Sequence, residues 1–351
     1  MLVCERDNSI VIGHQCGFHI PMKPKSVFKE MLDAIDSLQN VSEIVALLRN
    51  ITSRSYVAPR TTAYHYMSAD TLNIILKGVE NDKFKLRFTR IDYMNDTMDG
   101  KEGYYQLLRT IEYTLKRTLE GGSELLQEMY NKLHDGFSKL LFLRPCTRTQ
   151  SVGTRFMVDG ELCDAYVCSL SLDPESIPLW RSYGSGFAES YAIGIRLDEL
   201  AAVQVCCIDY DDYAQTGRFL PGKVISKIIE ACKEGVIVKS DVSDIVNAIM
   251  EFFSAWSVSH KIYAWEHENE MRLVKFVKVG VKPEGYIVRN GVFRPYFDEK
   301  FDVKCVHEVI VGPMVERYNA ARSIDEYMGE KGFGGGRDKL QVRCSVLPVR
   351  F

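Results

Sequence analysis

The feature that most constrains the fold is a series of short strand-like runs rich in β-branched residues. In chain order the runs are AYVCSLS, SYAIGIRL, VQVCCIDY, EMRLVKF, GYIVR, VKCVHEVIVGP and the closing QVRCSVLPVRF. Apolar residues occupy both alternating faces of EMRLVKF, so we expect this strand in a layer that is covered on both sides. Helical patterns separate the runs, which predicts an α/β (α+β) fold with a central mixed β-sheet core.

The helical segments divide the chain unevenly around this sheet. Residues 1–60 are predicted to form an N-terminal helical extension, in which Ser26 and Ser42 each cap a helix. Residues 61–351 are predicted to form a single α/β catalytic-like domain, because 351 residues fit one large domain with insertions. The helical insertions are expected near 100–143 and 222–259.

Two segments carry recognisable signals for the start and end of a helix. AYHYMSADTLNIILKG is expected to be a short strand followed by a helix capped at Ser68 or Asp70 and ended by Gly78. Asp173 is expected to cap a second short helix, with Pro174 at its first position.

Composition narrows the class of protein. The formal net charge is −3, which does not favour DNA binding, since a duplex-binding domain is usually clearly basic. None of the ten cysteines stands in a C-x-x-C pair, so we expect ten free thiols and a cytoplasmic setting. The first residues do not resemble a signal peptide, and no uninterrupted apolar run is long enough for a membrane span.

The stretch WEHENEMRLVKF carries the strongest candidate site. If it is a strand, Glu268, Glu270 and Arg272 share one face, at the rim of a buried surface. Repulsion between the two carboxylates would raise the proton affinity of one of them, which suits acid/base chemistry or stabilisation of a cation. The alternative is an exposed ladder of salt bridges, in which Arg272 neutralises both acids.

His65, Trp180 and Tyr183 are weaker candidates. His65 lies between two tyrosines in an expected strand, where a histidine is more often a core residue than a catalytic one. Trp180 and Tyr183 precede a glycine turn and would offer a flat surface for stacking a ring, or they would pack in the core.

Metal and phosphate-loop motifs are missing from the sequence. The seven histidines are scattered, no H-E-x-x-H motif occurs, and we predict no metal site. The glycine-rich run GFGGGR (residues 332–337) lacks the lysine–serine pair and the following helix of a phosphate loop. We therefore expect it to connect the last helix with the last strand.

Several short motifs together resemble a known bacterial family. They are His65-Tyr66-Met67-Ser68, Asn95-Asp96, Ser169-Leu170-Ser171, Trp180-Arg181-Ser182-Tyr183-Gly184, Ile193-Gly194-Ile195, the segment from Lys261 to Arg272, and Ile310-Val311-Gly312-Pro313. Their order resembles the family catalogued as domain of unknown function 2971, over about residues 61 to 350. The chain departs from the pattern at Met67, Leu170 and Thr97, where the family usually has threonine, phenylalanine and proline.

That family name implies no activity, but the motif order is also similar to the layout of ADP-ribosyltransferases. This second resemblance implies an NAD-consuming enzyme with NAD as its substrate and a protein or nucleic acid as acceptor, in a role such as toxin, anti-phage defence protein or effector. It implies catalytic roles for Glu270 and Glu268, and NAD-binding roles for His65, Tyr66, Trp180, Tyr183 and Arg272.

Within that resemblance, Glu270 would stabilise positive charge on the ribose, as a carboxylate does in glycoside cleavage. Glu268 would orient the acceptor, His65 would hold the ribose, and Tyr183 or Trp180 would stack on nicotinamide. The alternative is a non-catalytic binding module in which the E-x-E-x-R strand is structural.

Overall fold

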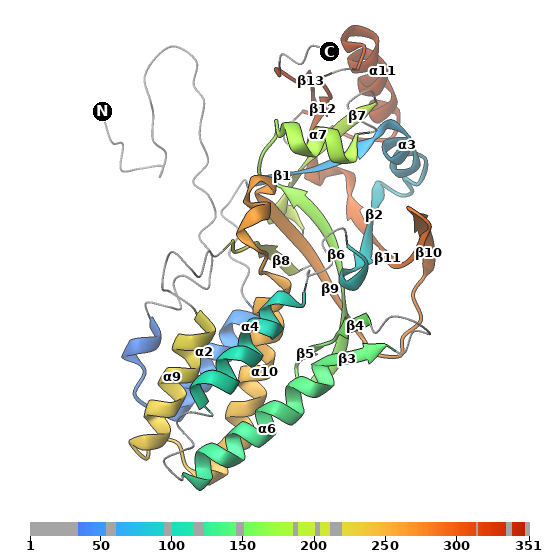
Figure 1. Ribbon diagram of the computed structural model, residues 1–351. Helices are drawn as coiled ribbons and strands as arrows, with labels where there is room; N and C mark the ends of the chain where they lie inside the picture. Colours follow the sequence, from blue (N-terminus) through green and yellow to red (C-terminus); the bar gives the residue numbers. More distant parts are fainter. Residues whose placement is uncertain are drawn as a thin grey trace, which may run out of the picture.

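The computed structural model describes residues 34–53, 61–94, 100–115, 123–144, 151–184, 189–200, 204–210, 220–313, 315–334 and 339–347. Its central element is an eleven-stranded mixed sheet. A group of long helices lies at one end of the molecule, and the sheet extends from them to the other end (Figure 1). The α/β fold with helical insertions is therefore confirmed.

The sheet is built mostly from antiparallel pairs, with one parallel pair at its end. Its strands are β1 (Thr62–Ser68), β2 (Lys83–Arg90), β5 (Phe156–Val158), β6 (Glu161–Ser171), β7 (Ser190–Arg196), β8 (Gln204–Cys207), β9 (Glu270–Lys278), β10 (Gly285–Arg289), β11 (Val292–Asp302), β12 (Val306–Val311) and β13 (Gln341–Cys344). A separate hairpin consists of β3 (Leu141–Arg144) and β4 (Ser151–Thr154).

The helices differ in length and type. The α-helices are α2 (Val41–Ser53), α3 (Ala69–Lys77), α4 (Glu102–Thr110), α6 (Glu124–Leu140), α7 (Ile177–Tyr183), α9 (Leu220–Lys233), α10 (Val242–Val258) and α11 (Arg317–Glu330). Shorter turns of 3₁₀-helix are η1 (Ile35–Ser37), η2 (Ile91–Tyr93), η5 (Leu197–Glu199), η6 (Lys239–Asp241), η7 (Tyr263–Glu268) and η8 (Val303–Cys305), and η3 (Ile111–Leu115) is a π-helix. None of the described helices combines the length and apolarity needed to cross a lipid bilayer.

Helix α10 organises the helical end of the molecule. Phe252, Phe253 and Trp256 of α10 are buried and belong to one hydrophobic cluster with side chains of α2, α6 and α9. Ile44 and Leu48 place α2 in that cluster, and α2 packs directly against α10. The helix predicted after Ser42 therefore shares its core with the helices of the two predicted insertions.

The cap predicted at Ser68 is confirmed, whereas the caps predicted at Ser42 and Asp173 are wrong. Helix α2 begins at Val41, so Ser42 lies inside it, and the Glu43 amide donates to the side-chain oxygen of Asn40 instead. Ser68 is the N-cap of α3, where its hydroxyl accepts a hydrogen bond from the Thr71 amide, and Gly78 follows the last residue of the helix. The second helix, α7, begins at Ile177 rather than at Pro174. Asp173 instead accepts a hydrogen bond from the Glu175 amide, so its carboxylate closes a turn ahead of the helix.

Strand β11 is the longest element that the sequence patterns did not predict. Its segment VFRPYFDEKFD contains a proline and several charged residues, which weaken the usual strand signal. The helix predicted from Ser26 begins outside the described residues, and the motif Asn95-Asp96 lies outside them.

A split in the sheet creates the space for a site. One edge of β6 pairs with β9 from Cys163 to Ser171. The other edge pairs with β2 at Val167 and with β1 at Ser171, and none of the described strands occupies the stretch between them. The sheet order continues through β11 and β10 beyond β2, and through β7, β12 and β13 beyond β1, so the sheet divides at this point.

Candidate functional site

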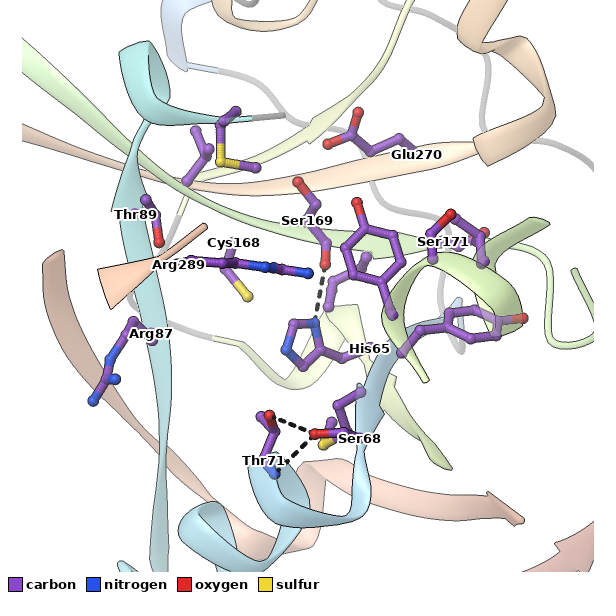
Figure 2. A pocket seen from close by; sticks show the side chains of 18 of the residues that line it. His65, Ser68, Thr71, Arg87, Thr89, Cys168, Ser169, Ser171, Glu270 and Arg289 are labelled. Carbon is purple, nitrogen blue, oxygen red and sulfur yellow. Dashed lines mark hydrogen bonds between the residues drawn. The ribbon is translucent and has the colours of Figure 1, made fainter. Parts of the chain in front are cut away.

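A pocket of about 480 Å³ lies at the split between β1 and β2 (Figure 2). Its walls come from β1, β2, β6, α7, the segment Glu268–Glu270, and the β10–β11 hairpin. Five of the seven residues predicted as catalytic or NAD-binding line it together: His65, Tyr66, Tyr183, Glu268 and Glu270. These residues are separated by up to about two hundred positions in the chain, and the sheet topology is what brings them into one cavity.

His65 occupies the gap that the split leaves in the β-ladder. Its Nδ1 atom lies 3.0 Å from the carbonyl oxygen of Ser169, on the part of β6 that has no strand partner on that edge among the described residues. Because a carbonyl only accepts, Nδ1 must carry the hydrogen, and Nε2 of the neutral ring is then an acceptor. Burial lowers the pKa of His65, which favours this neutral form at pH 7.

Two carboxylates and two cations form a buried cluster beside the pocket. Arg272 donates from Nε and Nη2 to the two oxygens of Glu270, at 2.9 and 3.1 Å. Lys261 donates to both acids, at 2.5 Å to Glu268 and 3.1 Å to Glu270. The exposed ladder of salt bridges is therefore not what forms, because Glu270 is only 4% exposed and Arg272 is fully buried.

The strand register differs from the sequence-based prediction at Glu268. This residue ends the 3₁₀-helix η7, and β9 begins only at Glu270. Asn269 separates the two in a left-handed conformation with φ of 43°, which asparagine tolerates better than most residues. Strict alternation therefore does not hold across Asn269, and the contact with Lys261 brings the two carboxylates together instead.

The ionisation of Glu270 also differs from the prediction. Burial alone would raise its pKa, but the charges and hydrogen bonds of Arg272 and Lys261 outweigh burial and hold the pKa of Glu270 below its ordinary value. Repulsion was expected to raise the proton affinity of one of the two acids, and Glu270 is not that acid, because Arg272 and Lys261 neutralise its charge. Glu270 is thus an anion at neutral pH, which suits stabilisation of positive charge and does not suit donation of a proton.

Tyr183 presents an aromatic ring at the pocket wall. Burial, together with the nearby charges of Glu268 and Glu270, raises the pKa of its hydroxyl to about 12, so the phenol stays neutral. The guanidinium of Arg289 lies 5.8 Å from the ring centre. The ring is therefore placed between the carboxylates and an arginine of the β10–β11 hairpin.

Three of the predicted ligand-binding residues have other contacts. Trp180 is buried, does not line the pocket, and packs edge-to-face on Tyr66 with ring centres 4.6 Å apart. The Tyr66 hydroxyl donates to the Asp173 carbonyl and accepts from the Ser176 amide, which fixes the start of α7. Arg272 lies behind Glu270 and donates from Nη1 to the Val258 carbonyl, so it supports the site without lining it.

The structure adds residues that sequence reasoning did not single out. Lys261 precedes η7 and contacts both acids, and its place at the start of the late family motif was the one available signal. The Tyr210 hydroxyl accepts a hydrogen bond from the amide of Glu270 and so fixes the start of β9. Arg289 and Arg294 line the pocket from the β10–β11 hairpin, where only the strand register shows that they lie together.

The described residues contain no group of three or more histidine, cysteine or acidic side chains arranged to hold a metal ion. Among the cysteines, Cys163, Cys168, Cys232 and Cys305 are free thiols. Cys168 lines the pocket, and burial raises the pKa of its thiol to about 12, so it is protonated and a poor nucleophile at neutral pH.

Comparisons with family models, with curated proteins and with solved structures found no match to this chain. The resemblances noted in the sequence therefore stay predictions.

Proposed function

We propose that the pocket binds NAD and cleaves the bond between nicotinamide and ribose, transferring ADP-ribose to an acceptor macromolecule or to water. The observation that carries this proposal is the presence of His65, Tyr183, Glu268 and Glu270 on the walls of one pocket of about 480 Å³. In this pocket the neutral imidazole of His65 can accept a hydrogen bond from a sugar hydroxyl, and the ring of Tyr183 can stack on a flat ligand. Glu268 and Glu270 supply two carboxylates.

The chemistry requires a fixed negative charge rather than an acid. When the C1′–N1 bond breaks, its electron pair goes to nicotinamide, which is a neutral leaving group and needs no proton. The positive charge then develops on the ribose C1′ and ring oxygen, where an ionised carboxylate stabilises it. Glu270 meets this need because its pKa is held low and it faces the pocket, whereas Arg272 and Lys261 do not line the pocket.

The second half of the reaction requires a nucleophile that loses a proton as it attacks C1′. Glu268 is the second carboxylate on the pocket wall. Its side chain is 13% exposed, and one of its oxygens accepts a hydrogen bond from Lys261. In our proposal it orients the acceptor and receives the proton. His65 is neutral and holds a ribose hydroxyl through Nε2, since its Nδ1 is committed to Ser169.

Release of nicotinamide tests the proposal directly. Purified protein is incubated with NAD, with and without a cell extract as a source of acceptors, and nicotinamide is quantified by chromatography. Glu270→Gln should lower the initial rate by on the order of 10²-fold or more, as expected when one preorganised electrostatic partner is lost. Glu266→Gln is the matched control, because Glu266 is an acid on η7 that does not line the pocket and whose side chain is exposed.

Far-UV circular dichroism must first show that both variants are folded, since Glu270 has buried partners. No release of nicotinamide by the wild-type protein under either condition would refute the proposal. An equal loss of rate in Glu266→Gln and Glu270→Gln would refute the role of Glu270.

A second candidate function is a binding module that holds a nucleotide without cleaving it. The observation that favours it is the full engagement of Glu270, whose two oxygens accept three hydrogen bonds from Arg272 and Lys261. This function predicts that NAD binds and is recovered intact after prolonged incubation with the wild-type protein.

A further inference from the structure

The β10–β11 hairpin directs two arginines to the same side of the sheet. In its register, Arg294 lies opposite Ile287, and Arg289 lies two positions along the same strand from Ile287. Residues two apart in a strand share a face, as do residues directly opposite each other. Arg289 and Arg294 are thus diagonal neighbours on one face, and both line the pocket.

Neither arginine is neutralised by a carboxylate of the described residues. Arg87, a third arginine of the pocket wall, forms an ion pair with Asp298 at 3.0 Å, but no such pair involves Arg289 or Arg294. The Nε atom of Arg294 is buried and has no hydrogen-bond partner in the described part of the chain. A buried donor without a partner is costly, so an acceptor from a ligand or from water would stabilise this atom.

The two positive charges also act on each other. Partial burial lowers the pKa of Arg294, and the neighbouring charge of Arg289 lowers it further. An anion placed between the two guanidinium groups would offset their mutual repulsion and would accept hydrogen bonds from both. Figure 2 shows Arg289 extended into the pocket toward His65, which places its donors where a ligand would lie.

Further donors lie on the opposite side of His65. The hydroxyls of Ser68 and Thr71, at the start of α3, line the same pocket, 3.1 Å from each other. The pocket therefore has the hydroxyls of Ser68 and Thr71 on one side of His65 and the carboxylate of Glu270 on the other, with Arg289 extending between His65 and Glu270 (Figure 2).

We propose that Arg289 and Arg294 form a phosphate-binding subsite and that the ligand of the pocket is a nucleoside diphosphate or an ester of one. Planar guanidinium groups bind phosphate oxygens in pairs of hydrogen bonds, and two of them match the two phosphates of a diphosphate. The subsite extends the proposed function, since NAD contains such a diphosphate, but it depends only on the contacts of the hairpin.

Calorimetric binding of ADP, inorganic pyrophosphate and adenosine tests the subsite without any glycosidic cleavage. We expect ADP to bind at least about tenfold more tightly than adenosine, pyrophosphate to bind measurably, and the affinity for ADP to fall as salt rises. Arg289→Gln and Arg294→Gln should each weaken ADP binding by about tenfold or more, because each removes charge-assisted hydrogen bonds.

Two control variants test whether the effect is specific to the arginines of the hairpin. Arg322→Gln on α11 removes an exposed arginine that does not line the pocket and should leave the affinity for ADP unchanged. Arg87→Gln should weaken ADP binding less than either hairpin variant, because Asp298 already neutralises that charge.

Equal affinities for ADP and adenosine, no binding of ADP, or unchanged ADP affinity in the double hairpin variant would each overturn the subsite. Failure of the proposed NAD cleavage has a different signature. In that case nicotinamide is not released, while ADP still binds and still depends on Arg289 and Arg294.

Discussion

Replacement of Arg272 by methionine is the sharpest test of how the site is held together. Arg272 is fully buried and donates hydrogen bonds to both carboxylate oxygens of Glu270 and to the Val258 carbonyl. Arg272→Met keeps an unbranched side chain but removes the charge and all of these donors. It leaves Glu270 ionised, 4% exposed, and with Lys261 as its remaining cation.

The expected loss of stability follows from these contacts. Removing one partner of a buried, hydrogen-bonded ion pair typically costs about 3–5 kcal/mol, mainly because the other charge stays buried without full compensation. The Val258 carbonyl also loses its hydrogen bond from Arg272, and we count this loss within the same total of about 3–5 kcal/mol. We therefore expect Arg272→Met to lower the free energy of unfolding by about 3–5 kcal/mol at pH 7.

The pH dependence gives an independent check with a defined sign. In the wild type, the folded-state pKa of Glu270 lies below its unfolded value, so its stabilisation is present above about pH 4.3 and is lost as pH falls toward the folded pKa. Without Arg272 the carboxyl is easier to protonate. The deficit of Arg272→Met relative to the wild type should therefore shrink as pH falls from about 7 toward about 3.

Urea denaturation followed by circular dichroism, repeated at several pH values, measures both quantities. The double variant Arg272→Met, Glu270→Leu removes both charges and should recover a large part of the loss, since apolar replacement of a buried pair is often nearly neutral. A loss below about 1 kcal/mol, a deficit that does not shrink with falling pH, or a double variant no more stable than Arg272→Met would refute this account of the cluster.

Two further predictions concern His65 and the cysteines. His65→Phe keeps a flat ring but removes the donor to the Ser169 carbonyl, so it should lower the free energy of unfolding by about 1–3 kcal/mol in urea titrations, and no loss would contradict the hydrogen bond. Because burial lowers the pKa of His65, the contribution of the neutral ring to the free energy of unfolding is present above about pH 6.5 and is lost as pH falls through the folded pKa. NMR titration of the ring should show that lowered pKa. Thiol titration in denaturant without reductant should count ten thiols, and a count of eight or fewer would indicate a disulfide.

Local features of this protein were readable from the sequence because local interactions decide them. The strand before α3, the Ser68 cap and the end of the helix at Gly78 depend on side-chain periodicity and backbone preference within a few residues. The α/β class followed in the same way from the alternation of strand and helix patterns. At Asp173 the sequence pattern predicted a helix cap, but the segment forms a turn and the helix begins later. The Tyr66 hydroxyl, which comes from a strand about one hundred residues earlier, fixes this segment through hydrogen bonds with the Asp173 carbonyl and the Ser176 amide.

The site itself depended on tertiary structure. The stretch of β6 between its contacts with β2 and β1 gives His65 its partner and opens the pocket, and such strand pairings form between distant segments that no local pattern specifies. The sign of the pKa shift of Glu270 had the same origin. Repulsion from Glu268 was visible in the sequence, but the stronger effect is contact with Lys261 and Arg272 inside a buried cluster, and burial and charge proximity exist only once the chain is folded.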